Sequence, residues 1–145
     1  MSTTPLGTRS LKIKIGATEY NADVNDCQII AGPADSSFTS FAAAASGGAR
    51  KYTLKFTATQ DPADATSIWR KVWMSAGSTI AVVINPYGGA NASAANPTYS
   101  GNVVVTEPDG NLLGGPANSD PSAKFTIDLE WVFTGKPVET ITGAY

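Results

Sequence analysis

Apolar and polar residues alternate with a period of two along three segments of the chain, which indicates strands with one buried face. These segments are residues 11–15, 50–59 and 124–134. In 50–59 the alternation is expected to bury Tyr52, Leu54, Phe56 and Ala58. In 124–134 it is expected to bury Phe125, Ile127, Leu129, Trp131 and Phe133, while the polar residues between them face away.

Other strands are expected where apolar and polar residues alternate less regularly. Residues 79–84 form a continuous apolar run, which is typical of a strand buried on both faces. Shorter strands are expected at 18–24, 27–31 and 99–106, and a short edge strand within 135–145.

One segment has helical spacing, from about residue 62 to 76. Asp61 can cap this helix, Pro62 takes the first helical position, and Asp64 lies in the first turn. Gly77 ends the helix. The apolar stripe expected to pack on a sheet consists of Ala65, Ile68, Trp69, Val72, Trp73 and Ala76.

A long run of Gly, Pro, Ser and Ala at residues 31–49 is expected to be a loop. Phe38 and Phe41 are the aromatic residues within it. Two interpretations stay open: the rings fold back onto the core of the domain, or they dock on another subunit. Loops of this length in compact domains are usually functional or disordered.

These elements predict one mostly-β domain over residues 1–145, with flexible ends. The strands do not alternate with helices, so a parallel α/β sheet is not expected. An antiparallel β-sandwich or partly open barrel with one flanking helix fits the pattern best.

Composition adds a hint of assembly. Charged residues make up only 15% of the chain, where about 25% is usual. Surfaces of small neutral residues pack readily on one another, whereas free monomers usually carry more charge.

The net charge of −2, and a stretch from Val72 to Ala123 without Lys or Arg, argue against binding nucleic acid by charge neutralisation. Without a signal-peptide core or a long apolar span, we expect a soluble protein made in a cytoplasm.

The residues of common active sites are missing. There is no histidine, so a Ser-His-Asp triad is impossible and Cys27, the only cysteine, has no His partner. Neither GxGxxG nor GxxxxGK[ST] occurs. We therefore expect no catalysis, no cofactor and no metal site.

Carboxylates are the remaining candidates. Asp128 and Glu130 lie two apart on one expected strand and project from the same face, a spacing that glycosidases also use, but a solvated strand face is the simpler interpretation. Glu107, Asp109 and Asp120 match no EF-hand spacing, and turn formation explains the two aspartates.

The order of elements resembles the major tail (tail tube) proteins of long-tailed bacteriophages. The stretch KYTLKFTATQDPADATSIWRKVW at 51–73 is similar to the passage from strand to helix in that family. The stretch FTIDLEWVFTGKPVET at 125–140 is similar to its final strand. The resemblance covers most of residues 10–140 and rests on element order rather than on an invariant signature.

The resemblance implies a structural subunit that self-assembles into stacked hexameric rings. Sheets of neighbouring subunits would join around a lumen, and the loop at 31–49, with Phe38 and Phe41, would reach the adjacent ring. The implied partners are further copies of the chain and the tape-measure, tail-terminator and distal tail proteins, with DNA only in transit and no membrane. The implied location is the tail of the virion, after synthesis in the host cytoplasm.

A conduit for DNA should not hold DNA, so its wall should lack net positive charge. We hypothesise that Asp128 and Glu130 face the lumen. If the strand at 50–59 also lines it, acidic neighbours must offset Lys51 and Lys55. The rival interpretations are a carbohydrate-binding or adhesin-type sandwich, which would use Phe38, Phe41, Tyr87 and Tyr99, and another virion part such as a decoration or tail-terminator protein.

Overall fold

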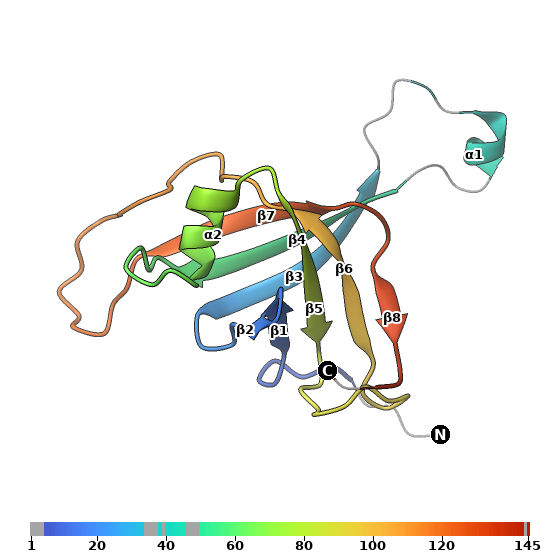
Figure 1. Ribbon diagram of the computed structural model, residues 1–145, viewed down its shortest axis with the longest axis horizontal. Coiled ribbons are helices and arrows are strands. Elements are labelled where there is room, and N and C mark those ends of the chain that lie inside the picture. The colour runs from blue at the N-terminus through green and yellow to red at the C-terminus, as the bar shows by residue number, and fades with distance from the viewer. Residues whose placement is uncertain (1–4, 34–37, 39, 46–49, 144) are drawn as a thin grey trace.

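The computed structural model describes residues 5–33, 38, 40–45, 50–143 and 145. Within these residues, eight strands form one antiparallel sheet, which confirms the expected mostly-β fold (Figure 1). Two helices lie outside the sheet, α1 (Phe41–Ala45) and α2 (Ile68–Ser75). The strands are β1 (Lys12–Ile15), β2 (Thr18–Glu19), β3 (Val24–Pro33), β4 (Arg50–Thr59), β5 (Thr79–Asn85), β6 (Thr98–Val104), β7 (Thr126–Phe133) and β8 (Val138–Thr140).

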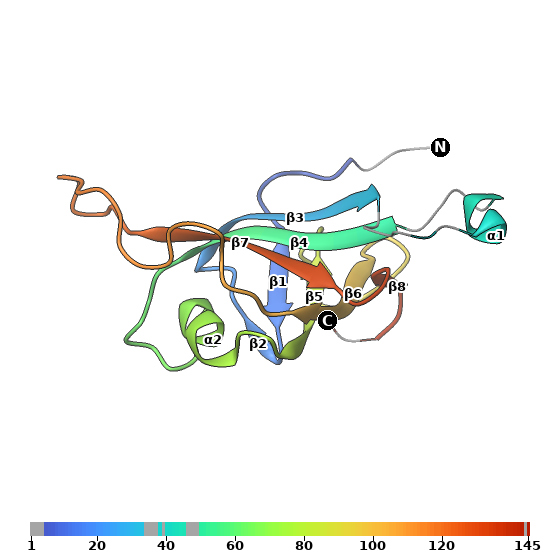
Figure 2. The same cartoon turned by 90° about the horizontal axis from the view of Figure 1, so that it is seen from above.

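The strand order is β2-β1-β5-β6-β7-β4-β3, and β8 pairs with β6 beside β7. The sheet curls at the junction of β6 and β7, where only Val103 and Val104 pair with Phe133 and Val132. Gly101 permits this bend, since a Cβ there would lie 2.9 Å from the Phe133 ring. As a result, β1, β5 and β6 lie across β3, β4 and β7 as in a partly open barrel (Figures 1 and 2).

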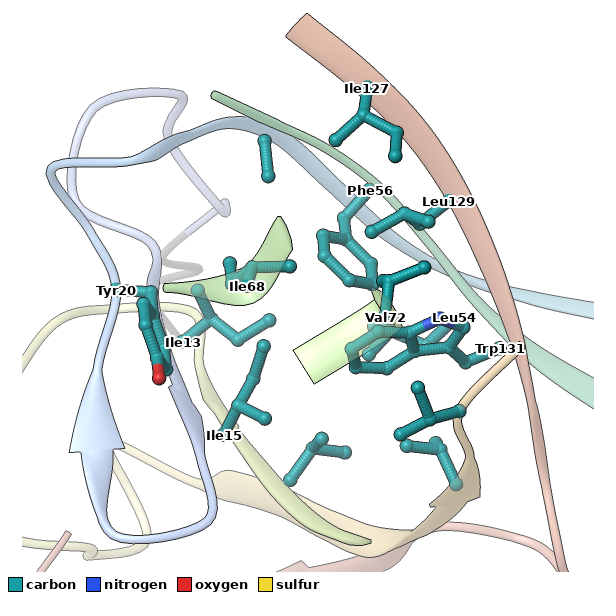
Figure 3. Close-up of a cluster of buried hydrophobic side chains, with 14 of the residues drawn as sticks. Ile13, Ile15, Tyr20, Leu54, Phe56, Ile68, Val72, Ile127, Leu129 and Trp131 are labelled. Atoms are coloured by element: carbon teal, nitrogen blue, oxygen red, sulfur yellow. The ribbon is translucent and has the colours of Figure 1, made fainter. Parts of the chain in front are cut away.

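The core fills the space between the two halves of the curled sheet (Figure 3). Trp131 of β7 and Phe56 of β4 meet edge to face, with ring centroids 4.8 Å apart. Ile13 and Ile15 of β1 face them from the other half. The alternation expected for β4 and β7 is therefore confirmed at Leu54, Phe56, Ala58, Ile127, Leu129, Trp131 and Phe133, all of which are buried.

The helix begins six residues later than the sequence pattern predicts. Ser67 is its N-cap: its Oγ accepts a hydrogen bond from the Arg70 amide at 3.2 Å. The same Oγ donates to the Asp61 carbonyl at 2.6 Å. Asp64 accepts bonds from the amide and the hydroxyl of Thr66, which closes a turn ahead of the helix. The predicted cap at Asp61 was wrong because these side chains hold residues 61–66 in turns.

The predicted apolar stripe of the helix is only half correct. Ile68, Trp69 and Val72 are buried, but Trp73 is 52% exposed, and Ala65 and Ala76 are exposed as well. Because α2 spans only two turns, its contact with the sheet is narrow.

Several predictions about strands and their ends also need correction. The strand expected at 18–24 ends at Glu19, and Tyr52, expected to be buried, is only half-buried. Phe125 is 47% exposed, because it precedes the first residue of β7. In β5, Val82 and Ile84 are buried but Ala81 is exposed and Val83 half-buried, so one face of the strand is not fully covered. The expected loop at 31–49 starts later than predicted, since β3 continues to Pro33, and it contains α1.

The described core predicts that substitutions of two leucines differ strongly in their effect on the free energy of unfolding. Replacing the buried Leu129 with Ala should lower the free energy of unfolding by about 2–5 kcal/mol, because it removes packed methyl groups and leaves a cavity. Leu113→Ala is the matched control: this side chain is 62% exposed, and the change should stay within about 0.5 kcal/mol. Urea unfolding at low protein concentration measures both, and equal losses would contradict the described core.

Candidate functional site

β3 is a long strand at the edge of the sheet. It pairs with β4 on one side over nearly its whole length, and no strand in the described part of the chain covers its other side. Its ten residues include one charged side chain, Asp26, and no lysine. Ile29 and Ile30 are 36% and 38% exposed. Monomeric proteins usually shorten, charge or cover such edges, because unpaired N–H and C=O groups recruit further strands.

The outer face of β4 and β7 carries both predicted carboxylates. Asp128 and Glu130 are exposed, between buried neighbours that point into the core. The Thr57 hydroxyl donates a hydrogen bond of 2.7 Å to Asp128 Oδ1. The register places Glu130 directly opposite Lys55. The structure therefore brings the two carboxylates to one face, as expected from the period of two.

The same face holds the lysines that the lumen hypothesis must offset. Lys51 and Lys55 alternate with the buried residues of β4, and Asp26 of β3 joins this face opposite Thr57. Three carboxylates (Asp26, Asp128 and Glu130) thus share the face with two lysines. The surface that these strands present has no excess of positive charge.

Phe38 and Phe41 lie outside the body of the domain. Their side chains are 79% and 97% exposed, so neither packs into the core. Phe41 begins α1, which stands apart from the sheet in both views (Figures 1 and 2). Of the two interpretations left open by the sequence, folding back onto the core is excluded for these side chains.

The aromatic residues that a carbohydrate site would need are not gathered. The Tyr99 hydroxyl donates to Glu139 Oε2 at 2.8 Å, and this bond raises the pKa of Tyr99. Tyr87 is half-buried in the segment between β5 and β6, which Figure 1 shows far from α1. Tyr87 and Tyr99, the other two residues proposed for that rival, therefore do not form one surface with Phe38 and Phe41.

A hollow of about 710 Å³ lies under the segment between β6 and β7. Gln60 fixes that segment: its Oε1 accepts from the Gly114 amide at 2.7 Å, and its Nε2 donates to the Gly114 carbonyl at 3.1 Å. The lining is mainly backbone, amides and prolines, with Asp109, Lys124 and Asp128 as its charged residues. The geometry explains how the segment is held and points to no reaction.

Of the three acidic loop residues, Asp120 has a turn role that its hydrogen bonds show. Asp120 Oδ1 accepts bonds from the Ser122 amide at 3.0 Å and the Ser122 hydroxyl at 2.9 Å, and these bonds lower the pKa of Asp120. Among the described residues, no three His, Cys, Asp or Glu side chains lie close enough together to hold a metal ion. No helix of that part of the chain is long and apolar enough to cross a membrane.

No protein-family model, curated protein or solved structure matches this chain. The tail-tube interpretation consequently depends on the order of elements and on the surfaces described above. The sequence pattern missed the most suggestive of these surfaces, the open edge of β3. A signal for it was present, because Val24–Pro33 combines ten residues without lysine and a pair of isoleucines.

Cys27 lies on the inner side of β3, opposite Phe56. Burial, with a smaller contribution from the Asp26 carboxylate, raises the pKa of its thiol to about 12. Because the thiolate is the reactive form, we expect the folded protein to react with iodoacetamide at pH 9 at least about tenfold more slowly than the urea-unfolded chain. Mass spectrometry of timed samples measures the two rates, and equal rates would contradict the burial of Cys27.

Proposed function

We propose that this chain is a structural subunit that self-assembles into stacked hexameric rings and so forms the tube of a phage tail, a conduit for DNA. The observation that carries the proposal is the outer edge of the ten-residue strand β3, with which no strand of the described residues pairs. A strand from a second copy would pair with this edge and extend the sheet. The hexameric number comes from the family resemblance.

Closure into a ring needs a second, different edge. Pairing of β3 with β3 of another copy would give a two-fold dimer and stop there, whereas pairing with a different strand is head-to-tail and can close a ring. At the opposite end of the sheet the terminal strand among the described residues is the two-residue β2, which pairs with β1. The described sheet thus has one long edge, β3, and one short edge, β2.

The outer face of β3, β4 and β7 is suited to line the lumen. Glu130 lies opposite Lys55, and Asp26 and Asp128 flank Thr57 on the same face. Carboxylates at these positions keep the wall from holding phosphate. By resemblance, the partners would be the tape-measure, tail-terminator and distal tail proteins, and DNA would bind only in passing.

A lysine on the β3 edge should weaken assembly. Ile30→Lys adds a charge to the edge that a second strand would cover, and we expect it to raise the concentration needed for assembly at least about tenfold. Ile141→Lys is the matched control, because Ile141 is an exposed isoleucine outside the sheet. Sedimentation velocity and negative-stain electron microscopy measure assembly.

The wild-type chain tests the proposal itself in the same experiment. Stacked rings or tubes at high concentration are the expected result. Featureless monomers at every concentration would contradict it and favour the carbohydrate-binding or adhesin-type module, which glycan binding by the monomer would then test.

Reversing charge on the proposed lumenal face should make the tube retain DNA. In Asp128→Lys/Glu130→Lys the face gains positive charge, and we expect duplex DNA to be retained at low salt and released as salt rises. Asp61→Lys/Glu139→Lys changes charge equally, at two exposed positions outside β3, β4 and β7, and should behave as wild type. Co-sedimentation of labelled DNA with the tubes measures retention. A tube structure with both carboxylates on the outer wall would rule out the lumenal assignment.

A further inference from the structure

A second exposed apolar surface lies on α2 and the segment after β6. Trp73, Met74 and Leu113 are 52%, 68% and 62% exposed; we call them the α2 patch. Trp73 stacks on the buried Trp69 with ring centroids 5.4 Å apart. Trp69 Nε1 in turn donates a 2.7 Å hydrogen bond to the carbonyl of Leu112, next to Leu113. These contacts connect Trp73, through Trp69, to the segment that carries Leu113, while the Trp73 side chain stays half exposed.

Basic residues border this patch. Arg70 precedes Trp73 by three positions and Met74 by four, so it lies on the same side of the helix. Lys71 precedes Met74 by three, and α2 contains no acidic residue. An occupant of the α2 patch should therefore be apolar and neutral or slightly acidic.

The segment around α1 has this chemistry. Between Pro33 and Arg50 the sequence contains one charged residue, Asp35, and otherwise Ala, Ser, Gly, Thr and the two phenylalanines. The helix itself is five residues long, where isolated helices below about 12–15 residues are marginal in water. Phe41, at its start, is 97% exposed. Burying a phenylalanine removes about 150–250 Å² from water, so a receiving surface would stabilise both the ring and the helix.

The two surfaces cannot meet within one copy. In both views α1 stands at one end of the longest axis of the molecule, and α2 lies towards the other end (Figures 1 and 2). A protruding helix at one end and a receiving surface towards the other end make a head-to-tail contact. Such a contact can repeat from copy to copy without closing into a ring. Repetition along an axis is what the stacking of rings requires.

We propose that α1 of one copy, through Phe41, docks on the α2 patch of a second copy in the next ring. The apolar ring is received by Trp73, Met74 and Leu113. This inference rests on the proposed function, because it names the partner surface for the loop that joins one ring to the next.

Disulfide trapping tests the contact. Phe41→Cys/Met74→Cys, in a Cys27→Ala background, should give a ladder of covalent dimers, trimers and longer chains on a non-reducing gel after mild oxidation of assembled protein. The matched control Phe41→Cys/Ala95→Cys places the second thiol at an exposed position between β5 and β6 and should give no ladder. In addition, Phe41→Ser should raise the concentration needed for tube formation at least about tenfold.

The outcomes separate the two proposals. Tubes seen by electron microscopy without a Phe41→Cys/Met74→Cys ladder would overturn the docking and leave the tube intact. A mixture of the single variants Phe41→Cys and Met74→Cys that forms covalent dimers, in a protein that never forms tubes, would support the docking and contradict the tube. A ladder as strong from the Ala95 control as from Met74 would show random collision and overturn the docking.

Discussion

Antiparallel pairing of β4 with β7 is the interaction on which the rest of the structure depends, because one register sets two surfaces. On the inner face it brings Phe56 against Trp131 at the centre of the core. On the outer face it places Lys55 opposite Glu130 and Thr57 opposite Asp128. Because side chains alternate, a slip of one residue would exchange the faces, exposing the core and burying the charges.

The third strand of this half, β3, lies at the edge of the described sheet. β3 hydrogen-bonds to β4 along one side, and within the described residues its other side has no strand. The curl of the sheet buries the core residues within one copy. The outer backbone groups of β3, in contrast, have no strand of the described residues to pair with. Assembly in the proposed tube would therefore extend the sheet by strand pairing and would not need to bury further core residues.

Stacking would use different chemistry in a different direction. Phe41 and the α2 patch are apolar surfaces at opposite ends of the molecule, while the β3 edge runs along the sheet. Backbone hydrogen bonds would thus join neighbours within a ring, and side-chain burial would join rings. The two kinds of contact can be weakened separately, which is why single substitutions distinguish them.

Local pattern alone determined the strands with one buried face. The period of two in 50–59 and 124–134 identified β4, most of β7 and the shared face of Asp128 and Glu130, because that period is a property of the extended backbone. The pattern failed to predict helix capping and burial at positions where more than one local contact was available. Ser67 rather than Asp61 caps α2, and Trp73 remains half in water, because the curl of the sheet decides which turn of the helix finds a surface. The open edge of β3 is likewise a result of strand order, which depends on pairings between residues far apart in the chain and is therefore decided only by the tertiary structure.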